Sequence, residues 1–266
     1  MTRFFKYISF LLVLAILFSF VACDAAIPVI GGTEDTSDTT ETPPEIPPTP
    51  KKRVALTFDD GPANDDLMYL IVDKLAQYGG KATFFLVGNR INTSTGKAIK
   101  YASDKGSEIG IHAFTHDHDF SFSDYDTFTT ELKDTKNAIE KYSGKEVTLF
   151  RPPYGSITEW RAEDSGYPII LWNLDSEDWR YKSRADEATA EENIRIIADN
   201  ILSSVKDGDI ILMHEIYRNS YEAACIVIDT LSAEGYEFVT VTELLGEDNL
   251  IAGKTYYNLT AKELTE

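Results

Sequence analysis

The 266-residue sequence contains only two cysteines, Cys23 and Cys225, and only four histidines. Two cysteines exclude a disulfide framework and a cysteine-rich zinc site. Basic residues are also scarce, since 25 lysines and arginines stand against 44 aspartates and glutamates, a formal net charge of −19. This charge excludes nucleic-acid binding through a basic surface. Hydrophobic residues make up 43% of the chain, which excludes wholesale disorder and is typical of a globular protein with a buried core.

Residues 1–23 are predicted to form an export signal. Arg3 and Lys6 precede an apolar run from Ile8 to Val21, which is shorter than the roughly 20 residues of a membrane span. The segment ends in a sequence that resembles a bacterial lipobox, Phe20-Val21-Ala22-Cys23. We therefore expect lipidation of Cys23 and an extracytoplasmic lipoprotein anchored to the bacterial cell membrane. The alternative is a secreted protein whose cysteine is incidental.

The remaining chain is predicted to have three parts. Residues 24–50 are rich in threonine, proline and acidic residues and contain no lysine or arginine. Such a segment cannot bury enough apolar surface to fold alone, so we expect a disordered linker that holds the next domain away from the bilayer. The folded domain is predicted to span residues 51–245. Residues 246–266 form a C-terminal extension with few structural signals.

Strand and helix patterns alternate through residues 51–245. Short β-prone apolar runs predict strands at 54–58, 82–87, 108–111, 147–150, 169–172, 210–213 and 238–241. Helical spacing of apolar residues predicts helices at 65–78, 97–104, 125–142, 159–164, 190–205 and 221–234. This alternation implies parallel strands with helices outside. The pattern predicts an α/β fold, a distorted (β/α)7 barrel, with a doubly wound open sheet as the alternative.

Polar residues gather just after five of the predicted strands. They are Asp59-Asp60, the segment from His112 to His116, the segment from Arg151 to Tyr154, the segment from Asp175 to Trp179, and His214. In a parallel barrel the C-terminal ends of the strands share one face, which is the face that bears catalytic residues. The arrangement therefore predicts an enzyme.

Two histidines and a carboxylate among these residues predict a metal site. His112 and His116 are four residues apart and can face the same point, although such a pair alone is also common among structural or surface histidines. Two imidazoles and one carboxylate leave a coordination position open, as catalytic zinc requires. Asp59 and Asp60 are adjacent in an extended segment, so their side chains should diverge. One could bind metal and the other act as a base, with Arg151 as a nearby cation.

Five sequence motifs, in order, resemble those of the polysaccharide deacetylases, the NodB-homology enzymes of carbohydrate esterase family 4. The motifs are Thr57-Phe58-Asp59-Asp60-Gly61-Pro62, His112-Ala113-Phe114-Thr115-His116, Arg151-Pro152-Pro153-Tyr154, Asp175-Ser176-Glu177-Asp178-Trp179 and Leu212-Met213-His214. The resemblance extends from about Arg53 to Leu245 and implies a NodB-like distorted (β/α) barrel. The sequence departs from the family at Ala113, where the family has a serine or threonine that braces the metal-binding loop.

The resemblance implies a role for each motif residue. Asp60, His112 and His116 would hold a divalent metal, Zn²⁺ or else Co²⁺, Ni²⁺ or Mn²⁺. Asp59 would be the general base, and Arg151 would orient it and keep it ionised.

The remaining implied roles concern the leaving group and the substrate. His214 would be the general acid, with Asp178 as the carboxylate that keeps it protonated. The backbone N–H of Tyr154 would stabilise the oxyanion. Three residues would contact the substrate around its acetyl group: Trp179, Leu212 and Pro153.

The implied function is metal-dependent removal of N-acetyl groups from an extracellular glycan. Peptidoglycan GlcNAc is the expected substrate, because a membrane-tethered bacterial enzyme lies beside the cell wall. The alternatives are chitin oligomers, O-acetylated xylan, or a non-catalytic relative that only binds glycan. We expect a monomer that binds an acetylated glycan and, through its lipid anchor, the membrane, and that does not bind nucleic acid.

Overall fold

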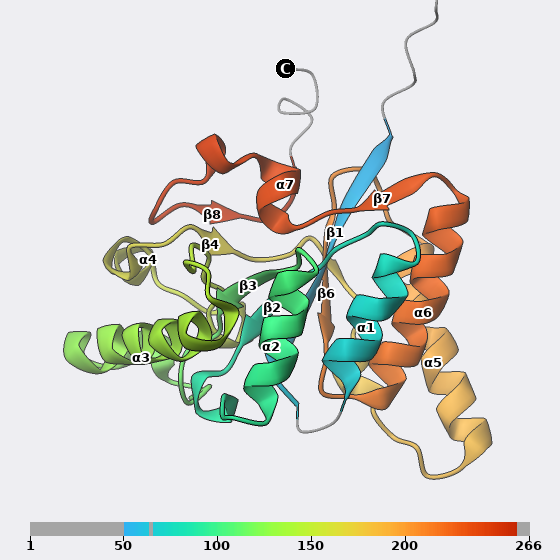
Figure 1. The fold of residues 1–266 in the computed structure, drawn as a ribbon, viewed down its shortest axis with the longest axis horizontal. Coiled ribbons are helices and arrows are strands. Elements are labelled where there is room, and N and C mark those ends of the chain that lie inside the picture. Colours follow the sequence, from blue (N-terminus) through green and yellow to red (C-terminus); the bar gives the residue numbers. More distant parts are fainter. Residues whose placement is uncertain (1–50, 64–65, 260–266) are drawn as a thin grey trace, which may run out of the picture. The chain divides into compact units, whose positions relative to one another are not determined.

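The computed structural model describes residues 51–63 and 66–259 (Figure 1). The predicted export signal, the lipidation site Cys23 and the predicted linker lie outside the described residues. Among the helices of the described ranges, none is both long enough and apolar enough to cross a membrane.

The fold is a mainly parallel α/β structure built around one central strand. The strands of its main sheet are β1 (Lys52–Gly61), β2 (Thr83–Leu86), β3 (Glu108–Ile111), β5 (Leu174–Asp175), β6 (Ile210–His214) and β7 (Tyr236–Phe238). The order is β3-β2-β1-β6-β5, and β7 pairs with the beginning of β1. Every one of these pairings is parallel, as the predicted βα alternation requires.

The pairings close into a distorted barrel. Phe150 forms parallel bridges with Ile111 of β3 and with Ile169. Ile169 begins a stretch that contains β4 (Ile169–Ile170) and then β5, which pairs with β6. The same stretch therefore joins the β3 edge of the sheet to the β6 edge. The predicted barrel is confirmed, and the open-sheet alternative is not what forms.

Helices surround the sheet (Figure 1). They are α1 (Leu67–Ala76), α2 (Thr95–Asp104), α3 (Tyr125–Ser143), α4 (Glu159–Ser165), α5 (Glu187–Leu202), α6 (Arg218–Ala233) and α7 (Val241–Leu245). The bounds of α3 follow from its ends. The side chain of Asp124 accepts a hydrogen bond from the backbone N–H of Thr127 at the N-terminus, and Gly144 at the C-terminus has the left-handed conformation, with φ 68°.

Three predicted strands differ from the observed elements. The strand predicted at 147–150 is reduced to the bridge at Phe150. The strand predicted at 169–172 is shortened to β4 at residues 169–170, and β5 follows at 174–175. Between the two strands, the side chain of Asn173 accepts a hydrogen bond from Ile210 N. The strand predicted at 238–241 is β7 at residues 236–238. Thr240 and Glu243 form a capping box there, so the chain enters α7 at Val241.

Residues of the predicted C-terminal extension also pair with the sheet. β8 (Thr255–Tyr256) lies parallel to β4, and Asn258 bridges Asp209.

Strand residues alternate between two hydrophobic cores, as the two-residue period of a strand requires. Leu56 of β1 belongs to the larger core, which includes the helices, whereas Ala55 belongs to a smaller core that includes Val241 and Leu244 of α7. The smaller core lies inside the barrel. Helix α7 covers the end where β1 begins (Figure 1), and Arg53 there donates to the backbone oxygen of Glu243. The opposite end of the barrel is left for polar residues.

Candidate active site

A cleft of about 600 Å³ lies where β1, β3 and β6 end. Eight of the predicted site residues line it: Asp59, Asp60, His112, His116, Tyr154, Trp179, Leu212 and His214. Arg151 and Asp178 are fully buried and contact the lining residues from behind. Pro153 is buried in a short 3-10 helix and is not among the lining residues. The structure thus brings together ten of the predicted residues, from five separate segments.

The histidines present free nitrogens toward Asp60. His112 Nδ1 lies 2.8 Å from the backbone oxygen of Arg151, so Nδ1 carries the hydrogen and Nε2 is free to bind a cation. Burial lowers the pKa of His112 despite its acidic neighbours, which keeps the ring neutral. His116 Nε2 lies 3.0 Å from Asp60 Oδ1, and His112 Nε2 lies 3.6 Å from the same oxygen.

These three residues fit a divalent cation. One ligand atom from each lies within 4.8 Å of the others. Asp60 Oδ1 is buried and faces the Nε2 atoms of both histidines. Burial alone would raise the pKa of Asp60, but His116 and His112 outweigh burial and lower it, so the carboxylate is ionised. An ionised carboxylate beside two imidazole nitrogens is a typical zinc donor set.

Unusual backbone conformations aim the ligands. Asp60, Ala113, His116 and Tyr154 all have positive φ, between 59° and 70°. Such a conformation costs a non-glycine residue about 1–3 kcal/mol and is concentrated at functional sites. The sequence predicted an extended conformation for Asp60, and this prediction is wrong. The carboxylates of Asp59 and Asp60 do diverge, but the left-handed turn at Asp60 contributes to this as well as strand alternation.

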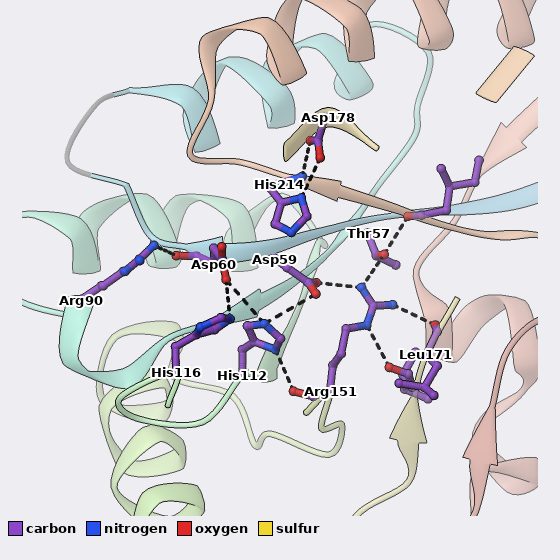
Figure 2. Close-up of polar contacts among 12 residues, drawn as sticks. Thr57, Asp59, Asp60, Arg90, His112, His116, Arg151, Leu171, Asp178 and His214 are labelled. Atoms are coloured by element: carbon purple, nitrogen blue, oxygen red, sulfur yellow. Dashed lines mark hydrogen bonds and ion pairs between the residues drawn. The ribbon is translucent and has the colours of Figure 1, made fainter. Parts of the chain in front are cut away.

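Arg151 fixes the carboxylate of Asp59 (Figure 2). Its Nη1 donates to Asp59 Oδ1 and to Thr57 Oγ1, both at 2.7 Å. Its Nε and Nη2 donate to the backbone oxygens of Ile170 and Leu171, at 2.8 and 3.0 Å. Asp59 is 3% exposed. Because four bonds hold the guanidinium, the position of Asp59 Oδ1 is fixed, while Oδ2 is left on the side of His112, 3.7 Å from its Nε2.

Asp178 holds His214 in the same manner. Asp178 Oδ1 lies 2.7 Å from His214 Nδ1, and Oδ2 accepts from the backbone N–H of His214 at 2.7 Å and from Ser220 Oγ at 2.6 Å. Burial lowers the pKa of His214, but the hydrogen bond and charge of Asp178 outweigh it and raise the pKa to about 9. Figure 2 places the imidazole between Asp178 and the carboxylates of β1. His214 is therefore a protonated acid at neutral pH.

Glu131 braces the loop of residues 112–116, called the histidine loop below. The sequence did not predict this contact. One of its oxygens accepts from the backbone N–H groups of Phe114 and Thr115, at 3.0 and 3.1 Å, and the other accepts from Thr115 Oγ1 at 2.6 Å. Ala113, which lacks the family's hydroxyl, is buried in this loop. Glu131 lies in the interior of α3 with no motif around it, so the sequence carried no signal of this contact.

Six further residues line the cleft without having been assigned to the site: Arg90, Trp172, Asp175, Lys182, Ile216 and Tyr217. Arg90 donates through Nη1 to the backbone oxygen of Asp60. Asp175 begins the fourth motif but had no role assigned to it, whereas the other five lie outside the motifs and only the folded chain brings them to the cleft.

Known proteins share this sequence and fold. A family profile described as polysaccharide deacetylase matches residues 47–168. The peptidoglycan-N-acetylglucosamine deacetylase PgdA of Listeria monocytogenes is 34% identical over 226 residues, which are 84% of this chain and 46% of PgdA. This chain thus spans less than half the length of that relative. A peptidoglycan-N-acetylglucosamine deacetylase of Bacillus cereus is 34% identical over 208 residues, which are 74% of this chain and 90% of that protein.

A solved structure agrees with these sequence matches. The family 4 acetyl xylan esterase from Clostridium thermocellum, in complex with a cobalt ion, matches with a TM-score of 0.69 and 32% identity. The match covers 78% of this chain and 99% of that one. Together with the barrel and the five motifs that meet in one cleft, these similarities show that the chain belongs to the polysaccharide deacetylase family, carbohydrate esterase family 4.

Proposed function

We propose that the protein is a metal-dependent hydrolase that removes N-acetyl groups from peptidoglycan GlcNAc. The observation that carries the proposal is the convergence of a fixed carboxylate, a protonated imidazole and a cation-binding triad in one cleft. Asp59, His214 and the Asp60 triad all line it. Loss of any of these groups would have favoured a protein that only binds glycan.

The triad would hold the metal through Asp60 and the Nε2 atoms of His112 and His116. When bound, Zn²⁺ or a similar divalent ion such as Co²⁺, Ni²⁺ or Mn²⁺ polarises a carbonyl and lowers the pKa of water. The cobalt ion in the Clostridium esterase supports this type of cofactor.

The protein's own groups would move the protons. Arg151 occupies Oδ1 of Asp59, so Oδ2 is the oxygen that would accept the proton of the attacking water. Asp178 occupies Nδ1 of His214, so Nε2 is the atom that would give a proton to the leaving amine. One residue thus takes a proton while the other supplies one, which hydrolysis of an amide requires.

The cleft would also position the acetyl group. The left-handed backbone at Tyr154 and its place at the cleft support its N–H as a donor to the oxyanion. Leu212 and Trp179 line the cleft and would contact the acetyl methyl group. Pro153 is buried, so it would support the lining of the cleft and would not itself contact the substrate.

The names of the relatives support peptidoglycan as substrate, and the acetyl xylan esterase keeps O-acetylated xylan as an alternative. We also propose that Cys23 is lipidated, which would hold the protein outside the cell membrane and beside the wall.

Acetate release tests the proposal. The zinc-loaded full chain is incubated with peptidoglycan, GlcNAc oligomers and O-acetylated xylan, with and without a chelator. We expect chelator-sensitive release, fastest with peptidoglycan. No release from any glycan by the metal-loaded protein would favour a binding module, and release that a chelator leaves unchanged would contradict metal dependence.

A further inference from the structure

We propose that Arg90 and Lys182 form an anion-binding subsite of the cleft that takes a carboxylate group of the glycan. This inference rests on the proposed function, because it specifies which glycan the same cleft prefers. Among the described residues, these two supply the lysine and arginine side chains that line the cleft. Both are solvent-exposed, so a ligand can reach them.

Tyr217 lines the cleft together with both cations. Lys182 Nζ lies 5.6 Å from the centre of the Tyr217 ring. Arg90 lines the same cleft and donates through Nη1 to the backbone oxygen of Asp60. The Tyr217 ring centre is 6.2 Å from that of His214. The subsite therefore adjoins the proposed general acid and hence the sugar side of the scissile amide.

Neither cation is neutralised by a carboxylate of the described residues. Within residues 51–63 and 66–259, neither Arg90 nor Lys182 forms an ion pair with a carboxylate, and the side chain of Arg90 donates only to the backbone oxygen of Asp60. By contrast, the basic residues on either side of Lys182 in sequence are paired: Arg180 with Glu177 and Arg184 with Glu222.

The acidic residues of the cleft have other partners. Asp59 is bound to Arg151, Asp60 is turned to the histidines, and Asp175 Oδ1 accepts from Glu177 N. Although the full sequence has 44 acidic against 25 basic residues, the part of the chain that the structure describes offers these two cleft cations no carboxylate partner.

A carboxylate-bearing glycan fits this chemistry. A guanidinium can form paired hydrogen bonds with a carboxylate, and a lysine ammonium adds a point charge. The main chains of chitin and xylan are neutral. Peptidoglycan carries carboxylates on the sugar next to GlcNAc, either on the lactyl group itself or on the peptide attached to it. The subsite would therefore favour peptidoglycan.

Matched substrates test the inference. Three soluble glycans of equal length are tested as substrates of the zinc-loaded full chain. One has free lactyl carboxylates, the second is its neutral methyl ester, and the third has peptides on the lactyl groups. We expect kcat/KM for the free carboxylate to exceed that for the ester about tenfold, and the difference to shrink at high salt. Arg90→Gln and Lys182→Gln should each lower this ratio about three- to fivefold, mainly through KM. The ratio for the peptide-bearing glycan to the ester shows which carboxylate is bound.

The ratio separates this inference from folding and metal loading. A variant that is partly unfolded or poorly loaded loses rate on both substrates, which leaves the ratio unchanged. Lys133→Gln removes an exposed lysine of α3 outside the cleft lining and should keep the ratio of the original protein.

Two results would overturn the inference. One is equal rates for all three glycans, and the other is a ratio that neither variant changes; both leave the proposed deacetylase intact. If no glycan releases acetate, the proposed function fails instead. Titration calorimetry of the free carboxylate against the ester then decides the subsite by itself, because equal affinities contradict it and tighter carboxylate binding supports it.

Discussion

A fully buried arginine controls the carboxylate proposed as the general base. The guanidinium of Arg151 lies 4.2 Å from the ring centre of Phe85, and the residue is not exposed to solvent. A buried charge is tolerated only when it is paired and hydrogen-bonded, and removing one partner of such a pair costs about 3–5 kcal/mol. The burial of each charge therefore depends on the other residue, and the hydrogen bond from Arg151 to Oδ1 sets the position of Asp59 Oδ2.

Asp59→Asn tests the base. The amide keeps an oxygen that can accept from Arg151 but cannot take a proton, so acetate release should fall by about 10²–10⁴-fold. Because Asp59 is not a member of the triad, zinc content measured by mass spectrometry should stay near that of the original protein. The matched variant Asp60→Asn should lose zinc as well as activity. Loss of zinc from Asp59→Asn would contradict the assignment.

Asp178→Asn tests the general acid through the pH profile. A His214 pKa of about 9 means that the imidazole is protonated below about pH 9 and neutral above it, so activity should persist to that pH and then fall. In Asp178→Asn the hydrogen bond and charge that raise the pKa of His214 are weakened, while burial still lowers the pKa. The alkaline limb of kcat should therefore shift to lower pH. An unshifted limb would remove His214 from the role.

At the scale of elements, α3 braces the histidine loop. Glu131 accepts three hydrogen bonds from that loop, including two from backbone N–H groups. Such contacts hold metal ligands in place where Ala113 offers no hydroxyl. We therefore expect Glu131 to support the loop at the position where this sequence departs from its family.

Glu131→Gln should weaken metal binding. The amide keeps only one acceptor oxygen where the carboxylate has two, so the loop loses part of its support. We expect zinc affinity, measured by competition with a chromogenic chelator, to fall about tenfold or more, with activity restored at high zinc. Asp134→Asn, an exposed change on the same helix, serves as the control and should keep the affinity. Equal affinities in the two variants would show that Glu131 does not support the site.

The sequence predicts those elements whose periodic pattern extends over many residues or that end in a motif. The helices 125–142 and 190–205 and the strand 108–111 match α3, α5 and β3 closely. Helix α7 has only five residues, too few for a periodic pattern, although the sequence Thr240-Val241-Thr242-Glu243 did carry a capping-box signal. Strand β8 has two residues and exists because β4 is there to pair with it.

The site residues, too, could be predicted from the sequence only where they belong to a motif. The assigned catalytic and metal-binding residues occur in motifs at strand ends, where chain order alone brings them to one face. Glu131, Arg90 and Lys182 reach the site from segments that contain none of the five motifs. Their roles arise from tertiary contacts, such as the bond from Arg90 to Asp60.

At the scale of the molecule, the barrel interior changes from apolar to charged along its axis. Leu244 and Leu245 of α7 pack in the smaller core at one end. Thr57 lies further along β1 and accepts a hydrogen bond from Arg151, and Asp59 lies at the cleft. The alternate residues 55, 57 and 59 of one strand thus lead from the hydrophobic core to the proposed base.

Cys23→Ser tests where the molecule resides. If Cys23 is lipidated, the original protein should sediment with membranes and dissolve only with detergent, whereas Cys23→Ser should appear in the soluble fraction. Cys225→Ser changes the other cysteine, which lies on α6, and should remain with the membranes. Retention of Cys23→Ser in the membrane fraction would contradict the lipid anchor.

The central claim is that Asp60, His112 and His116 hold one catalytic cation between Asp59 and His214. Anomalous diffraction at the zinc edge, from crystals of the zinc-loaded protein, tests it most directly. The account predicts a peak bonded to Asp60 and to Nε2 of both histidines, at about 2.0–2.2 Å. A peak elsewhere, or no peak at this triad in fully loaded crystals, would contradict it.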